Sequence, residues 1–589
     1  MSLKAVSADS ANIARHLPLM AARQPGHPAV KIPRGRTRTG DIDYLTLTYA
    51  ELAVEVDAWG ARLAAHGTRS GDRTLVMVRQ GLPLIAATFA LFKLGAVPVV
   101  IDPGMGLRNF LACVVRSQPR VLLGIPFARL VSRIFRKSFH TVEVRVAAGS
   151  SMTARLAGSP PQGQPHPSIM AESSADTLAA ILFTSGSTGD PKGVCYEHGM
   201  FDAQVRLIRD TYAIEPGEID LPLLPIFALF NPALGMTTVV PEFDPRRPAA
   251  VQPDKIVRAI QQEGVTNSFG SPTIWRKIAD HCIARGLVLP SLRRVLCEGA
   301  PVPASLWTAA QRFIPKGKLH SPYGATEVLP VSTATVEDIS AASVRGACVG
   351  KPLAENRVKI IAITDGPIAA LAAARELPPG EIGEIIVTGP TVTKEYDRLP
   401  EATALAKIRE EVPQTPNSEF PNTTGAQGAP DSSEIWDWEL GTSAPAGAVW
   451  HRMGDCGYLD EVGRLWFCGR VAERVETADG PMYTEPCEQV FRTHPWVARC
   501  ALVGLGPRGR QTPAGVIEPK AGTPVRAATE RQAFADTLRQ LAIRHPHTAG
   551  IGCFYFHSCL PVDVRHNAKI HRLRLANWAA TARAVKADK

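Results

Sequence analysis

Apolar residues in the first quarter of the chain follow two alternating spacings. Residues 47–67 and 82–96 carry them at the three- and four-residue intervals of a helix. Residues 74–79 and 97–102 are short apolar runs of the kind found in buried strands. Because strands alternate with helices, this pattern predicts an α/β fold with mostly parallel sheets.

Residues 82–101 form the most apolar stretch of the chain. Lys93, Gly95 and Pro98 interrupt it, so it predicts a buried helix that turns into a buried strand and not a membrane span. Residues 1–30 lack the hydrophobic region of a signal peptide. We therefore expect a cytoplasmic protein.

The chain of 589 residues is long enough for at least two domains. We predict a large N-terminal domain of layered α/β subdomains over residues 1–470 and a small α+β lid domain over residues 471–589. The small unit contains strand candidates at 498–506 and 553–557 and a helix candidate at 528–545. Residues 148–175 form a polar linker, and residues 412–447, rich in Pro, Gly, Ser and Thr, predict a disordered or exposed insertion.

Composition excludes several classes of protein. The hydrophobic content of 45% and charged content of 20% are ordinary for a globular enzyme. The eleven cysteines include no CxxC pair, so neither a disulfide framework nor a zinc site is indicated. The net charge of +10 fits either a solvated basic surface or attraction of an anionic substrate such as ATP. No compact Lys/Arg block with interleaved aromatics stands out, so nucleic acid is not expected as a partner.

The strongest local signal is the loop sequence ILFTSGSTGDPKG at residues 181–193. An apolar strand runs into a loop with four hydroxyl residues, three glycines and one lysine: Thr184, Ser185, Ser187, Thr188, Gly186, Gly189, Gly193 and Lys192. Glycines allow the backbone N–H groups to approach phosphate oxygens closely. The Walker A spacing is absent, which disfavours a P-loop kinase or motor. A helix is expected to follow near His198.

The loop and a series of other motifs resemble the adenylate-forming superfamily of acyl-CoA ligases, nonribosomal adenylation domains and luciferases. The resemblance covers nearly the whole chain. In order, the motifs are LTYAEL (47–52), LFKLGAVPVVIDP (91–103), FTSGSTGDPKGV (183–194), GAP (299–301), YGATE (323–327), GEIGEIIVTGP (380–390), MGDCGYLD (453–460), GRLWFCGR (463–470) and NAKIHR (567–572).

The resemblance implies a role for each matching residue, with ATP and Mg²⁺ as the cofactors. The residues implied to hold the β- and γ-phosphates are Thr184, Ser185, Gly186, Ser187, Thr188, Gly189 and Lys192. Those implied to surround adenine are Tyr323, Gly324, Gly299, Ala300 and Pro301, and those implied at the ribose are Asp455 and Arg470. The implied catalytic residues are Lys569, Thr326, which contacts the α-phosphate, and Glu327, which is also the metal ligand.

Elementary chemistry independently favours these residue types. A carboxylate that attacks a phosphate brings negative charge towards negative charge, so cations and hydrogen-bond donors must stabilise the transition state. Mg²⁺ prefers hard oxygen ligands such as a glutamate. An ionised aspartate suits the two hydroxyl donors of a ribose. Taken singly, Asp455 could instead cap a turn and Lys569 could be a surface lysine.

The second half-reaction depends on the segment after Arg470. In coenzyme A ligases an Asp or Lys acts as the hinge, and a Gly-Gly pair shapes the pantetheine channel; here these positions hold Ala472, Ala478 and Asp479. Several longer strings resemble a particular subgroup, the β-lactone synthetases of bacterial long-chain olefin biosynthesis. They are residues 221–249, 321–332, 350–368, 451–485 and 561–572.

This subgroup implies activation of a 2-alkyl-3-hydroxy fatty acid as acyl-AMP, then attack of its own 3-hydroxyl to give a β-lactone. The tethered nucleophile needs little further ordering. His566 is a candidate base, although a structural histidine is the stronger interpretation. Residues 223–234 and 268–275 fit either an acyl pocket or ordinary core.

Three hypotheses follow from the sequence. They are a β-lactone synthetase, an acyl-CoA ligase or acyl-AMP ligase that loads a carrier protein, and a binding protein without catalysis. The last is disfavoured because the candidate catalytic residues are present. The first implies a thiolase, a reductase and a lactone decarboxylase as pathway neighbours.

Overall fold

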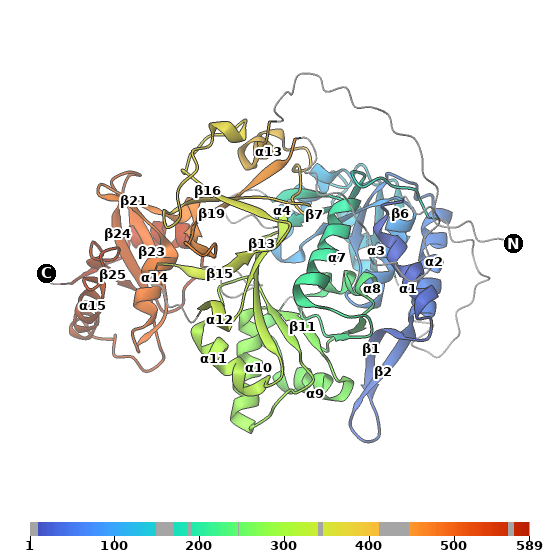
Figure 1. The fold of residues 1–589 in the computed structure, drawn as a ribbon, viewed down its shortest axis with the longest axis horizontal. Coiled ribbons are helices and arrows are strands. Elements are labelled where there is room, and N and C mark those ends of the chain that lie inside the picture. The colour runs from blue at the N-terminus through green and yellow to red at the C-terminus, as the bar shows by residue number, and fades with distance from the viewer. Residues whose placement is uncertain are drawn as a thin grey trace.

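A computed structural model describes residues 10–148, 170–184, 191–245, 247–339, 345–411, 447–562 and 570–587. Most of the predicted linker (149–169) and of the predicted insertion (412–446) lies outside these ranges. The described chain forms a large α/β part and a smaller C-terminal part beside it (Figure 1).

A six-stranded sheet in the N-terminal part confirms the alternation of strands and helices in the sequence. Its strands are parallel except for the last pair. In spatial order they are β6 (Val144–Ala147), β5 (Val121–Gly124), β3 (Arg73–Met77), β4 (Val97–Ile101), β7 (Leu178–Thr184) and β8 (Lys192–Glu197). The helices along this part of the chain are α1 (His16–Arg23), α2 (Tyr49–Ala65), α3 (Leu82–Lys93), α4 (Leu107–Ser117), α5 (Pro126–Ile134) and α7 (His198–Tyr212).

Helix α3 is enclosed by its neighbours. Eleven of its twelve residues are buried, including Lys93, whose ammonium pairs with Asp57 of α2. The apolar stretch at 82–101 is therefore a buried helix followed by a buried strand, as the sequence predicts. In the part of the chain that the structure describes, no helix is both long and apolar enough to cross a membrane.

The segment around the glycine-rich loop differs in one respect from a simple strand–loop–helix unit. Strands β7 and β8 pair antiparallel, with Thr184 opposite Lys192, and α7 begins only after β8, at His198. The loop therefore closes a β-hairpin, and a strand separates it from the following helix. The N-terminus of α7 is therefore not the element that directly follows the loop.

A second sheet has fourteen strands and two halves. The parallel half contains β10 (Thr237–Val239), β9 (Ile219–Asp220), β11 (Asn267–Gly270), β12 (Arg294–Cys297) and part of β13 (Lys318–Ala325), and ends at the hairpin β1 (Pro28–Arg36) and β2 (Ile42–Thr48). Helices α9 (Pro253–Glu263), α10 (Pro272–Arg285) and α11 (Ala304–Phe313) share a core with it. The short helices are α8 (Asn231–Leu234), α12 (Val336–Ile339) and α13 (Pro400–Ala406).

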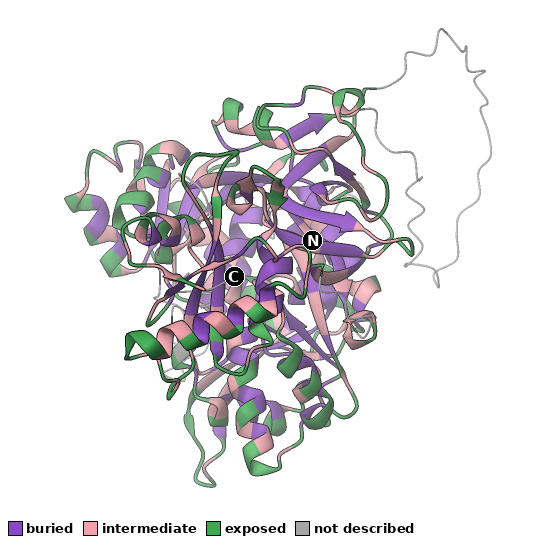
Figure 2. Ribbon diagram, turned by 90° about the vertical axis from the view of Figure 1, so that its left-hand side faces the viewer, coloured by how far each residue is buried: buried purple, intermediate pink, exposed green. Residues whose placement is uncertain are grey.

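The other half of this sheet is antiparallel, so "mostly parallel" describes the six-stranded sheet and only one half of the large one. Its strands are β14 (Val328–Ala334), β15 (Ala347–Pro352), β20 (Leu465–Arg470), β19 (Val449–Leu459), β17 (Gly383–Thr388), β16 (Arg357–Ile361) and β18 (Lys407–Arg409). Side chains from β14, β16, β17, β19 and β20 share one apolar core. In Figure 2 the strands are largely buried and exposure concentrates on helix faces and loops.

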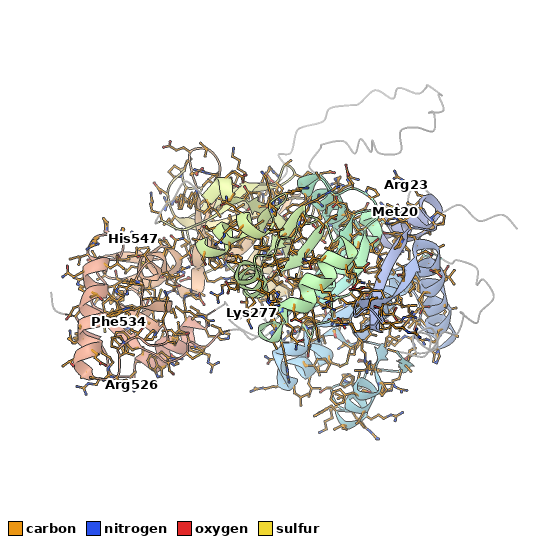
Figure 3. The ribbon with its side chains drawn as sticks, turned by 90° about the horizontal axis from the view of Figure 1, so that it is seen from below. Met20, Arg23, Lys277, Arg526, Phe534 and His547 are labelled. Carbon is orange, nitrogen blue, oxygen red and sulfur yellow. The ribbon has the colours of Figure 1, made fainter. Side chains whose placement is uncertain are left out.

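The C-terminal part has its own sheets and core. Its strands are β21 (Val475–Thr477), β22 (Gly480–Met482), β23 (Val497–Leu505), β24 (Thr512–Pro519), β25 (Cys553–Phe556) and β26 (Val585–Lys586), and its helices are α14 (Thr484–Arg492), α15 (Ala528–Ala542) and α16 (Arg572–Ala579). Phe534 of α15, labelled in Figure 3, is fully buried in this core. The predicted α/β architecture with a small α+β unit is confirmed, while the domain boundary at residue 470 stays a prediction.

His198 gives the fold a built-in sensitivity to acid. Its buried Nδ1 accepts a hydrogen bond from the Ile13 N–H at 3.2 Å, which requires a neutral ring. Burial, with a smaller contribution from Arg15, lowers the pKa of His198 to about 4. The unfolded chain binds a proton near the ordinary pKa of about 6.5. Stability from this group is therefore complete above that pH and is lost as pH falls towards 4.

We expect wild type to lose roughly 1–2 kcal/mol more apparent unfolding free energy between pH 7 and pH 5 than His198→Asn does. Asparagine retains an acceptor for Ile13 but does not titrate. Urea unfolding followed by tryptophan fluorescence measures the difference. His140→Asn, at an exposed position, is the matched control and should behave as wild type. Equal pH dependence in His198→Asn and wild type would contradict the assignment.

Candidate active site

The turn between β13 and β14 carries the YGATE motif. The O–H of Tyr196, on β8, donates to the carbonyl of Thr326, and Gln204 Nε2, on α7, donates to the carbonyl of Leu329 at 2.9 Å. A Cβ on Gly324 would lie 2.8 Å from the Val328 carbonyl oxygen, so only glycine fits there. The turn is thus held in place by β8 and α7, the strand and the helix that follow the glycine-rich loop.

Tyr323, Asp455 and Arg470 meet in one group that is joined by a hydrogen bond and an ion pair. Asp455 on β19 and Arg470 on β20 are cross-strand partners, with 2.9 Å between the guanidinium Nη1 and Asp455 Oδ1. The Tyr323 O–H donates to Asp455 Oδ2 at 2.7 Å. Burial, reinforced by Asp455, raises the pKa of Tyr323 well above its ordinary value, and Asp455 raises the pKa of Arg470. Three residues that the sequence assigns to adenine and ribose therefore lie together.

Glu327 is held by residues that the sequence analysis did not single out. The Tyr396 O–H donates to Glu327 Oε1 at 2.6 Å. The backbone N–H and the hydroxyl of Thr393 both donate to the Glu327 carbonyl, at 2.9 and 3.1 Å. These contacts fix both the backbone and the carboxylate of Glu327. The direction of its second carboxylate oxygen, Oε2, is therefore defined as well.

Two lysines flank the same tyrosine ring. The ammonium of Lys192 lies 4.7 Å from the Tyr396 ring centroid, and that of Lys407 lies 6.0 Å from it. Lys407 Nζ also donates to the Thr393 hydroxyl at 3.2 Å. Burial lowers the pKa of Lys407 to about 7, against the opposing effect of Glu327. A carboxylate, a phenol and two amines thus form one compact electrostatic group.

The segment that contains Tyr396 also fixes the end of the glycine-rich loop. The Asp397 N–H donates to the Gly193 carbonyl at 2.7 Å, and Tyr396 bridges to Val194. The buried carboxylate of Asp397 in turn forms a bidentate pair with Arg73 of β3, at 2.8 and 3.1 Å. Contacts through Tyr396 and Asp397 therefore connect β8, which begins at Lys192, to Arg73 on β3 of the same six-stranded sheet.

The structure brings together only part of the predicted phosphate loop. Thr184 ends β7 and Lys192 begins β8, whereas Ser185, Gly186, Ser187, Thr188 and Gly189 lie outside the described residues. Lys569 and His566 also lie outside them. The described neighbours of Lys569, Ile570 and His571, line the same cavity as Lys192, Tyr323, Glu327, Asp455 and Arg470.

That cavity measures about 3810 Å³, and both polar and apolar residues line it. Gly299, Ala300 and Pro301, which follow β12, line it together with Tyr323. Leu224, Phe227, Leu229 and Phe230 line it as well, whereas Leu223 and most of residues 268–275 lie in the core. The predicted acyl-pocket segments are therefore divided between cavity wall and core.

The donor set around Glu327 suits a cation that shares its ligands with phosphate. Within the described ranges, no group of three or more His, Cys, Asp or Glu side chains could form a metal cage. Mg²⁺ typically uses one or two carboxylates plus phosphate oxygens and waters. A single fixed glutamate beside a lysine that can bind phosphate fits that requirement.

Comparisons with known proteins show the family to which this chain belongs. The AMP-binding enzyme family matches residues 19–397. The olefin β-lactone synthetase of Xanthomonas campestris pv. campestris is 44% identical over 584 residues, covering 97% of this chain and 98% of that protein. Its counterpart from Stenotrophomonas maltophilia is 42% identical, with coverage of 97% and 98%. The structure of ATP-bound MatB from Rhodopseudomonas palustris has a TM-score of 0.71 at 20% identity, with coverage of 97% and 99%.

The chain belongs to the AMP-binding family of adenylate-forming enzymes. Within that family, its sequence is similar over nearly its whole length to olefin β-lactone synthetases. The resemblance that the sequence motifs indicated is thus confirmed for both the superfamily and the subgroup.

Tyr396→Phe tests whether the tyrosine positions Glu327. The ring remains, but the charge-assisted hydrogen bond to the carboxylate is lost, which corresponds to roughly a 10- to 100-fold effect. We expect ATP–pyrophosphate exchange to fall by about that factor and the Mg²⁺ concentration for half-maximal rate to rise.

Tyr44→Phe provides a matched control. The Tyr44 hydroxyl is buried without a hydrogen-bond partner among the described residues and lies on β2. Its removal should leave exchange unchanged. An unchanged Mg²⁺ requirement in Tyr396→Phe would show that the phenol does not position Glu327.

Proposed function

We propose that this enzyme activates a 2-alkyl-3-hydroxy fatty acid with ATP and then closes it to a β-lactone. The first step releases pyrophosphate and forms an acyl-AMP. In the second step the 3-hydroxyl of the substrate attacks the acyl carbon, and AMP leaves. The similarity to two olefin β-lactone synthetases over 97% of the chain is the observation that carries this proposal.

The described site supports the adenylation step. Asp455, fixed by Arg470 and Tyr323, presents a carboxylate to the ribose hydroxyls, and the Tyr323 ring offers a face for adenine. Lys192 contributes positive charge for the outer phosphates, and the fixed turn carries Thr326 to the α-phosphate. These groups hold their directions before substrate binds, so little reorganisation is needed in the transition state.

Mg²⁺ is proposed as the second cofactor, with Glu327 as its protein ligand. When bound, the cation neutralises charge on the phosphates. Tyr396 orients Glu327 by donating to its carboxylate, and Lys407, which also lies beside the Tyr396 ring, adds positive charge nearby. Lys569, delivered by the C-terminal domain, is proposed to neutralise the developing charge at the α-phosphate.

The hinge region favours the lactone over a thioester. Thr477 and Gly480 pair across a turn formed by Ala478 and Asp479, with the Thr477 hydroxyl donating to the Gly480 carbonyl at 2.8 Å. A tight turn thus stands where coenzyme A ligases carry a glycine pair. An acyl-CoA or acyl-AMP ligase remains the second candidate, because the family includes both.

The reaction sets this enzyme among three others. A condensing thiolase-type enzyme and a ketoacid reductase must supply the 2-alkyl-3-hydroxy acid, and a decarboxylase acts on the lactone. ATP supply places the reaction in the cytoplasm. His566 stays a candidate for the base that accepts the hydroxyl proton.

One assay separates the two candidates. The enzyme is incubated with ATP, Mg²⁺ and a 2-alkyl-3-hydroxy acid, with and without coenzyme A, and the products are analysed by mass spectrometry. We expect β-lactone and AMP without coenzyme A. A thioester that forms only with coenzyme A would replace the lactone proposal by the ligase, and absence of ATP–pyrophosphate exchange with every acid tested would end both.

Lys569→Ala should lower adenylation by about three orders of magnitude or more, because it removes a charge needed at the transition state. ATP binding, measured by calorimetry, should be largely unchanged, since the described contacts of the large domain persist. Lys586→Ala, at an exposed position of the same domain, is the control. Normal adenylation by Lys569→Ala would show that another group supplies the charge.

A further inference from the structure

Residues 103–142 carry a highly asymmetric charge. This segment contains seven Lys or Arg residues and no Asp or Glu, whereas the whole chain has 65 basic and 55 acidic residues. A single forty-residue segment therefore carries most of the net charge of +10. In Figure 3 this light-blue part of the chain lies at the lower edge of the large domain.

Helix α5 presents apolar side chains to solvent as well as to the core. Ala128 and Val131 face inwards and are buried. Phe127, Leu130 and Ile134 are 66%, 54% and 63% exposed, and their spacing of three and four residues places them along one face. Such a stripe of large apolar side chains exceeds what scattered surface residues would give.

Several cations around this stripe have no acidic partner among the residues that the structure describes. Arg133, Arg136 and Lys137 are exposed, and none forms an ion pair with a carboxylate of the described chain. Arg120 differs, because it pairs with Asp72 and Glu143. The face therefore combines exposed apolar groups with uncompensated positive charge.

The same face reaches the rim of the active-site cavity. Phe127 and Val131 of α5 line that cavity, as do Leu107 and Phe110 of α4. Leu107 is itself 54% exposed, so the rim is apolar on its outer side as well. The two helices share one core cluster, and the rings of Phe110 and Phe139 lie 6.4 Å apart within it.

We propose that α5 and the residues that follow it form a docking surface for an anionic lipid bilayer. Apolar side chains on one face, with lysines and arginines beside them, are the composition of helices that lie in a membrane interface. Each cation near an anionic surface adds electrostatic attraction. A second copy of this chain would bring the same positive face, so charge disfavours self-association there.

Docking of α5 to a bilayer would also explain why the cavity rim is apolar. This explanation rests on the proposed function. A long-chain hydroxy acid partitions into a bilayer, and its carboxylate lies at the interface. An enzyme seated there on α5 admits the alkyl chain over Leu107 and Phe127 without taking it through water.

Vesicle co-sedimentation tests the proposal directly. The full-length wild-type protein should sediment with phosphatidylcholine vesicles that contain phosphatidylglycerol, but not with phosphatidylcholine alone, and high salt should weaken binding. The double variant Leu130→Ser/Ile134→Ser, which alters neither cavity wall nor core, should bind at least about tenfold less. Arg133→Glu/Arg136→Glu should lose the preference for the anionic lipid.

Val288→Ser/Val462→Ser is the matched control, because these valines are 47% and 58% exposed but lie on other parts of the chain. It should bind vesicles as wild type does. Equal binding by Leu130→Ser/Ile134→Ser, or no binding by wild type, would overturn the proposal. The proposal would also be overturned if wild type formed a dimer in solution and Leu130→Ser/Ile134→Ser abolished that dimer.

Activity separates this proposal from the proposed function. For a short-chain soluble acid, Leu130→Ser/Ile134→Ser should keep wild-type ATP–pyrophosphate exchange, while the KM for a long-chain acid presented in anionic vesicles should rise about tenfold. Vesicle binding without any exchange activity would refute the proposed function but leave the docking surface supported. Exchange activity without vesicle binding would refute the docking surface but leave the proposed function supported.

Discussion

The contact between Tyr323 and Asp455, which are proposed to bind the nucleotide, depends on the curvature of one sheet. Strands β13 and β19 are separated by three others, so a flat sheet would place them roughly 19 Å apart. The hydrogen bond between Tyr323 and Asp455 is 2.7 Å long, so the antiparallel half must fold back on itself. Apolar side chains such as Val331, Ile385 and Leu465 fill the inside of that curl, and their burial stabilises it.

The phosphate end depends on a different constraint, the placement of charge in a buried region. Glu327 lines the cavity and is held by its neighbours. Tyr396 donates to it, and Lys407 and Lys192 lie around the same ring. Tyr396 also pairs with Val194 on the strand after the glycine-rich loop. Glu327 and Lys192, the proposed metal and phosphate ligands, therefore keep a fixed relation to each other before any ligand binds.

Sequence patterns predicted the alternation of helices and strands well, because buried helices and strands differ in the spacing of apolar residues. They also led to Tyr323, Asp455 and Arg470, which match motifs and do meet in space. They did not lead to Tyr396 or Lys407, since a tyrosine in a loop and a lysine in a short strand carry no local signal. Likewise, the antiparallel half of the large sheet was not foreseen, because pairing direction depends on distant segments.

What the sequence determined by itself is the chemistry available: a loop rich in glycine and hydroxyl residues, a glutamate, an aspartate, an arginine and lysines within recognisable motifs, and the superfamily to which these motifs belong. Only the tertiary structure decided which of the many charged side chains act together. Lys407 comes to lie where the charge of Glu327 opposes the effect of burial on its pKa, and α5 becomes an exposed apolar and basic face. Both depend on contacts between segments far apart in the chain. The spacing of apolar residues indicates the propensity of a segment for helix or strand. The burial of a side chain and its coupling to other charges depend on the whole fold.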